Sequence, residues 1–205
     1  MKDRPFVAIG VAIVALMVVV GAILVLSAVD VSAVGLRVNH RAVSQQTLNN
    51  ELHDFANSPV FANSYAQSGA EFKTTKGAVN SAAAAQWIAF RVQKTLAEQI
   101  LERRGVKVTS NDVRDARAAL KQQGTLAGLS GDAATQLAEY QAAVRKLTGS
   151  SGSASAAAAA VRRAARRAHV SIDPRYGSWN DRRVGICPAD GCRRFVSVLP
   201  SAQNQ

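Results

Sequence analysis

Residues 79–104 read VNSAAAAQWIAFRVQKTLAEQILERR, the strongest indication of fold class in the chain. Large apolar residues recur along it at three- and four-residue intervals, with charged residues between them. Gly105 follows directly and ends the pattern. The stretch therefore predicts a long helix that buries one apolar stripe and leaves its charged side chains outside that stripe. The stripe is Trp87, Ile88, Val92, Leu96 and Ile100, and the charged residues are Lys94, Glu98, Glu102 and Arg103.

Shorter helices are predicted on both sides of this stretch. Each has a capping residue at its start and a glycine or proline near its end. Ser44 begins a helix that ends near 57–59, and Thr109 or Ser110 begins one that ends at Gly124. Asp132 is expected to cap a third helix, which ends at Gly149, and residues 60–76 are expected to form a loop with a short helical turn.

Strands are predicted only at the two ends of the helical region. Ala33–Val43 reads AVGLRVNHRAV, two short alternating pieces around Asn39 and His40, which is typical of a small hairpin. Residues 169–200 mix apolar residues with turn residues and are expected to form strands and turns. Aromatic residues make up only 5% of the chain while alanine is abundant, so the predicted fold is mainly α.

A low-complexity segment, GSSGSAS at 149–155, divides the helical region and predicts a linker or a hinge. An alanine-rich helix is expected to follow it and to run through Ala168. The predicted organisation is an anchor at 1–29, a helical domain at 30–148, the linker at 149–155, a returning helix and strand at 156–180, and a tail at 181–205.

The N-terminus predicts the location of the protein. The chain is uncharged from Phe6 to Val29, longer than the roughly 20 apolar residues that cross a bilayer. This favours an uncleaved single-pass anchor in the cytoplasmic membrane over a cleaved signal peptide, although Val31-Ser32-Ala33 is a weak cleavage site. Lys2 and Arg4 favour a cytoplasmic N-terminus, with residues 30–205 exported.

Charge indicates the kind of partner. The formal net charge is +11, and a basic exported domain attracts anionic lipid, acidic envelope polymers or acidic client segments. Nucleic acid is a less natural partner outside the cell. Four arginines concentrate this charge on the alanine-rich helix. They form either a solvated face that complements the helix dipole or a surface that binds anions. These residues are Arg162, Arg163, Arg166 and Arg167.

The two cysteines, Cys187 and Cys192, are spaced C-P-A-D-G-C. In an oxidising compartment this spacing favours a disulfide that stabilises a local turn. The alternatives are weaker, because two ligands make a poor zinc site and the spacing is not the C-x-x-C of a redox pair.

Residues for catalysis are sparse. His40, His53 and His169 are isolated, the glycines form no phosphate-binding loop, and the acidic residues are scattered singly. We therefore expect no enzyme activity, cofactor or metal. A binding surface remains, because helices with shallow apolar faces can hold extended peptides. Its candidate residues are Phe61, Tyr65, Phe72, Trp87 and Phe90; core packing is the stronger reading for each, and Phe90 is expected to be the most exposed because it lies off the stripe.

The order of these elements resembles the N-terminal domain of SurA- and PrsA-type exported foldase chaperones. In that family a V-N-G-x-x-I-S segment opens the domain, and a long helix leads through V-T-x-x-D-V into the next. The closing VSIDPRYGSW at 170–179 also resembles the segment that follows the last helix in membrane-tethered or lipoprotein members of the family from GC-rich genomes. The matching residues are Val38, Asn39, Val43, Ser44, Val108, Thr109, Asp112 and Val113, while His40 replaces the usual glycine.

This resemblance implies a chaperone that binds unfolded exported polypeptides, with the strand at Leu36–Val38 paired to Val170–Ile172. Many members carry a parvulin isomerase domain where this chain has only 149–155. Isomerase activity is therefore the least favoured reading. The main alternative to a chaperone is a basic envelope scaffold that docks on anionic lipid or a membrane complex.

Overall fold

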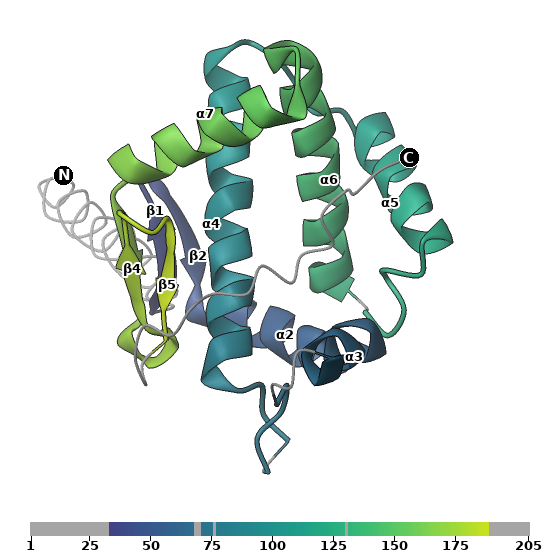
Figure 1. Cartoon of the computed structure of the whole chain (residues 1–205), viewed down its shortest axis with the longest axis vertical. Coiled ribbons are helices and arrows are strands. Elements are labelled where there is room, and N and C mark those ends of the chain that lie inside the picture. Colours follow the sequence, from purple (N-terminus) through teal and green to yellow (C-terminus); the bar gives the residue numbers. More distant parts are fainter. Residues whose placement is uncertain (1–32, 68–70, 76, 130, 189–205) are drawn as a thin grey trace, which may run out of the picture. The chain divides into compact units, whose positions relative to one another are not determined.

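Helix α4 (Ser81–Arg103) is central to the structure, a computed structural model that describes residues 33–67, 71–75, 77–129 and 131–188 (Figure 1). Asn80 caps this helix, because its side chain accepts a hydrogen bond from the backbone N–H of Ala83 at 2.8 Å. The predicted stripe is buried, but the helix is enclosed on more than one face, because α6, α7 and strand β1 all pack against it. Lys94, predicted to lie outside the buried part of the helix, is therefore itself buried.

The remaining helices surround α4. Helix α6 lies beside α4, α5 packs against α6, and α7 packs against both α4 and α6 (Figure 1). Ser44 and Thr109 cap α2 and α5 as predicted, and Thr109 forms a capping box with Asp112. The helices are α2 (Gln45–Ala56), α3 (Pro59–Gln67), α5 (Ser110–Gln122), α6 (Gly131–Ser151) and α7 (Ala154–Arg167).

Three predicted boundaries differ from the structure. The helical turn expected within 60–76 is the longer helix α3, and Asp132 lies in the first turn of α6 and does not precede it. Helix α6 continues through Gly149, and Gly152 makes the turn into α7 at φ +81°. The break predicted over 149–155 is thus narrowed to two residues, 152 and 153, because the residues before them continue α6 and those after them begin α7.

A three-stranded antiparallel sheet joins the two ends of the described chain. It has the order β2-β1-β3, from β1 (Val34–Val38), β2 (Arg41–Ser44) and β3 (Val170–Ile172). Leu36 pairs with Ile172 and Val38 with Val170, which is the pairing that the resemblance implies. A separate ladder joins β4 (Ser178–Asn180) to β5 (Gly185–Cys187), after the 3₁₀ turn Pro174–Tyr176. The described residues from Val34 onward belong to one compact unit.

Asn39 fixes the predicted hairpin turn between β1 and β2. Its φ of 55° is left-handed, a conformation that asparagine tolerates better than most residues. Its side chain accepts a hydrogen bond from the backbone N–H of His169 at 3.0 Å and donates one to Gln99 at 2.7 Å. One residue therefore joins the hairpin, β3 and α4.

We expect Asn39→Ala to lower the free energy of unfolding by about 2 kcal/mol. About 1 kcal/mol comes from the left-handed backbone and about 1 kcal/mol from the lost hydrogen bonds. Glycine adopts the left-handed conformation without strain, so Asn39→Gly should lose only the contribution of the hydrogen bonds. Urea unfolding followed by tryptophan fluorescence measures both variants, and equal losses would contradict the backbone argument.

Aromatic side chains form the core between α2, α3 and α4. Phe55 packs against Phe61 and Phe72, with ring centroids 4.7 and 5.1 Å apart, and Trp87 packs against Phe90 at 4.9 Å. Phe90 is only 2% exposed, so the expectation that it would be the most exposed aromatic is wrong. It faces Tyr140 of α6, a contact that the stripe on α4 alone does not reveal. The candidate client-binding residues Phe61, Tyr65, Phe72 and Phe90 are all buried.

Two predictions concern the ends of the chain. The predicted anchor at 6–29 lies outside the described residues, and so does Cys192. Cys187 is disulfide-bonded. Among the helices that the structure describes, none has the length and apolar character to cross a membrane.

Candidate functional site

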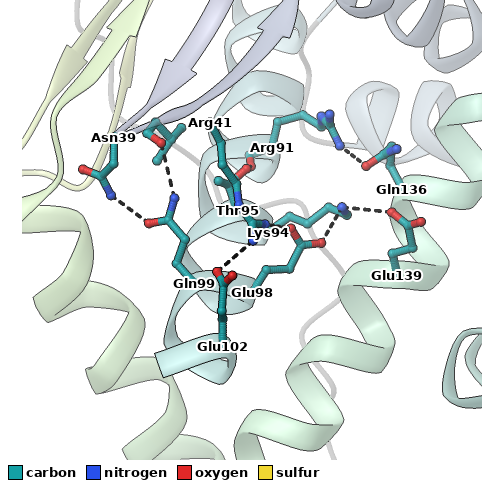
Figure 2. A network of polar contacts seen from close by, with 11 residues as sticks. Asn39, Arg41, Arg91, Lys94, Thr95, Glu98, Gln99, Glu102, Gln136 and Glu139 are labelled. Carbon is teal, nitrogen blue, oxygen red and sulfur yellow. Dashed lines mark hydrogen bonds and ion pairs between the residues drawn. The ribbon is translucent and has the colours of Figure 1, made fainter. Parts of the chain in front are cut away.

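A network of charged side chains connects α4 to strand β2 and helix α6 (Figure 2). Lys94 Nζ lies 2.6 Å from Glu98 and 2.9 Å from Glu139. Arg41 continues the network, with its two terminal nitrogens 2.9 Å from Glu98 and from Glu102. Because Lys94 is buried, its ammonium needs these carboxylates to offset the cost of leaving water.

The same helix carries a buried ion pair nearer its N-terminus. Arg91 Nε lies 3.2 Å from Glu51 Oε2, and the indole N–H of Trp87 donates to that same oxygen at 3.0 Å. Arg91 also donates to the side-chain oxygen of Gln136. Glu51 is fully buried, and its Oε1 atom has no hydrogen-bond partner among the described residues. Burial raises the pKa of Glu51, while the charge of Arg91 opposes the shift.

Two concave surfaces lie along the C-terminal half of α4, and Glu102 lines both. The first, which we call the apolar groove, lies between α4, α5 and α6 and has a volume of about 500 Å³. Apolar side chains line it together with a rim of charged residues from the network. The apolar residues are Leu101, Val106, Val108 and Val113, and the charged residues are Arg41, Glu98, Glu102, Lys107 and Glu139.

The second surface, which we call the basic cleft, lies between the hairpin turn, α4 and α7 and has a volume of about 810 Å³. Arg103 and Arg104 reach it from the end of α4, and Arg163 and Arg167 from one face of α7. His40 lies at its hairpin side. The cleft thus gathers positive charge from segments that are distant in the sequence.

The structure divides the four arginines singled out in the sequence. All four are exposed, but Arg163 and Arg167 line the basic cleft and Arg162 and Arg166 do not. Sequence reasoning missed Arg103 and Arg104 as partners, because nothing in the sequence indicates that α7 packs against the end of α4.

The remaining candidates stay apart. His53 is exposed on α2, His169 lies exposed before β3, and His40 has no acidic partner within ion-pair distance in the described part of the chain. No group of three or more His, Cys, Asp or Glu side chains within the described ranges could hold a metal ion.

The described residues form a mainly helical domain, closed by a small antiparallel sheet, with two concave surfaces beside one long helix. No family model, no curated protein and no solved structure matches this chain.

Proposed function

We propose that this protein is a non-catalytic, chaperone-like module that binds extended segments of unfolded exported polypeptides. The observation that carries the proposal is the apolar groove, whose valine and leucine side chains lie between charged residues of both signs. An apolar side chain of a client would be removed from water there, and this burial contributes about 25 cal/mol per Å² without requiring a particular sequence. The charged residues at the rim would keep the protein soluble when no client occupies the groove.

The topology supports the proposal. The opening strand β1 pairs with the closing strand β3, as the resemblance to the SurA and PrsA class implies for such domains. The aromatics Phe61, Tyr65, Phe72 and Phe90 are buried, so client contacts are assigned to the groove in their place. The proposal includes tethering by residues 6–29, with the domain outside the cell, because a chaperone without an active site benefits from being held where exported chains emerge.

An aggregation assay tests this function. The full chain in phosphatidylcholine nanodiscs should slow the aggregation of a reduced, unfolded client at near-stoichiometric ratios. Val108→Ser makes the groove more polar and should weaken this protection several-fold, because Val108 is only partly buried and its loss should leave the fold intact. The matched control is Val34→Ser on β1, an exposed valine that does not line the groove, and it should protect like the wild type.

Absence of protection by the wild-type chain would refute the chaperone function. Equal protection by the wild type and both variants would place the client elsewhere and refute the groove as its site. A proline-isomerisation assay on the same preparation should show no acceleration, and measurable activity would overturn the non-catalytic reading.

A further inference from the structure

The basic cleft brings four guanidinium groups to one concave surface. Arg163 and Arg167 are four residues apart, so they lie on the same side of α7, and Arg103 and Arg104 end α4 opposite them. Like charges gathered in a concave surface repel one another and create a strongly positive potential. Such an arrangement is favourable when an anion enters it.

Acidic side chains do not neutralise this charge. Glu102 is the one carboxylate among the lining residues, and Arg41 holds it at 2.9 Å. In the described part of the chain, no carboxylate lies within ion-pair distance of Arg103, Arg163 or Arg167. These three guanidinium groups are therefore available to an anionic ligand.

Arg104 differs from the other three, because it is held in place. One of its terminal nitrogens donates to the hydroxyls of Ser150 and Ser151 at 3.0 and 2.8 Å. These serines form the last turn of α6, so α6 positions an arginine of α4 beside the cleft. A guanidinium has five N–H donors, and the others remain to bind a ligand.

Helix dipoles alone do not account for the cleft. A basic residue in the last turn of any helix interacts favourably with the dipole, and Arg166 gains this benefit as Arg167 does. The dipole does not explain why arginines from two helices converge on one cavity. Arg162 and Arg166 share the composition and the helix but lie outside that cavity.

We infer that the basic cleft binds a phosphate-bearing anion with at least two negative charges. Guanidinium groups form paired N–H···O bonds to phosphate oxygens, and two arginines one turn apart on α7 facing two on α4 suit two adjacent phosphates or a phosphate with a polar substituent. The volume of about 810 Å³ admits more than a single phosphate. Such a group could come from a free diphosphate or from the headgroup of an anionic lipid. The inference does not rest on client binding in the apolar groove, whose lining shares Glu102 with the cleft.

Isothermal titration calorimetry on the full chain in phosphatidylcholine nanodiscs tests the inference. One arm uses inorganic pyrophosphate, and the other uses glycerol 3-phosphate, the free headgroup of phosphatidic acid, whose phosphomonoester carries up to two negative charges. The double variant Arg163→Gln/Arg167→Gln should weaken binding roughly 10-fold or more, because it removes two charge-assisted contacts. Arg162→Gln/Arg166→Gln removes the same charge from the same helix outside the cleft, and it should change the affinity by less than about 3-fold.

The outcomes separate the possible sources. If Arg163→Gln/Arg167→Gln loses affinity only for pyrophosphate, the result supports a free diphosphate as the ligand. If it loses affinity only for the headgroup, the result supports an anionic lipid. Equal losses in the two double variants, or no binding of either anion by the wild type, would overturn the inference. Arg103→Gln/Arg104→Gln is a second cleft variant on another helix, and it must weaken binding as well.

Discussion

Arg91→Met will lower the free energy of unfolding by about 3–5 kcal/mol at neutral pH, one of the two largest effects that we expect in this domain. Removing one partner of a buried ion pair leaves the other charge without compensation, and that cost is typically in this range. Glu51 is fully buried, and its Oε1 atom already lacks a hydrogen-bond partner among the described residues. Without Arg91, only the indole N–H of Trp87 would still donate to this carboxylate.

The loss should shrink on acidification. Burial raises the pKa of Glu51 above 4.5, while Arg91, Trp87 and Lys94 lower it and Asp132 raises it. A raised folded-state pKa means that the folded protein binds the proton more tightly than the unfolded chain. The resulting stabilisation is fully present below pH 4.5 and is lost as pH rises through the folded-state pKa. Removing Arg91 raises that pKa further, so the variant should be closest to the wild type in acid.

Chemical unfolding at pH 5 and pH 7 measures this difference, and Trp87 reports on it directly because it contacts Glu51. The control is Glu51→Gln/Arg91→Met, which removes both charges but keeps a side-chain oxygen for the indole. It should recover much of the stability and lose the pH dependence. The single and the double variant could instead lose the same free energy of unfolding at both pH values. That result would show that packing around the Arg91 side chain matters and its charge does not.

Local signals in the sequence were sufficient for most elements. Ser44, Thr109 and the left-handed Asn39 act within a few residues of their own position, so their patterns predict helix starts and a hairpin without any tertiary information. Gly149 failed as a helix end because a neighbouring glycine, Gly152, has the positive φ that the turn requires. Glycine marks a possible end, and the surrounding packing decides which glycine is used.

Tertiary packing determined what the sequence could not. A single amphipathic stripe predicts one buried face on α4, but contacts from α6, α7 and β1 enclose other faces as well. Lys94 and Arg91 are consequently buried, and their partners Glu139 and Glu51 come from other helices. The basic cleft could be predicted only in part for the same reason. The sequence of α7 indicates its own arginines, whereas the arginines at the end of α4 lie beside them only because the two helices pack together.

Phe90→Ala is the second variant for which we expect a large loss of stability. It also tests whether Phe90 is a core residue or a client-binding residue. The side chain is 2% exposed and packs against Trp87 and Tyr140, with ring centroids 4.9 and 5.1 Å away. Truncating a buried phenylalanine removes its transfer free energy and leaves a cavity, which together cost about 3–5 kcal/mol. Phe90→Leu retains much of the apolar volume and should lose less.

Denaturant midpoints with an unchanged slope would report the stability loss, and the aggregation assay on the same variants would report client protection. A core residue should lower stability while the protein that remains folded still protects the client. A client-binding residue should do the opposite and lower protection with little loss of stability. Because the aromatic core involves the N-terminal half of α4 and the apolar groove its C-terminal half, these two readouts for Phe90 and Val108 should change independently. Loss of protection by folded Phe90→Ala protein, with stability unchanged, would return the client site to the aromatics and away from the groove.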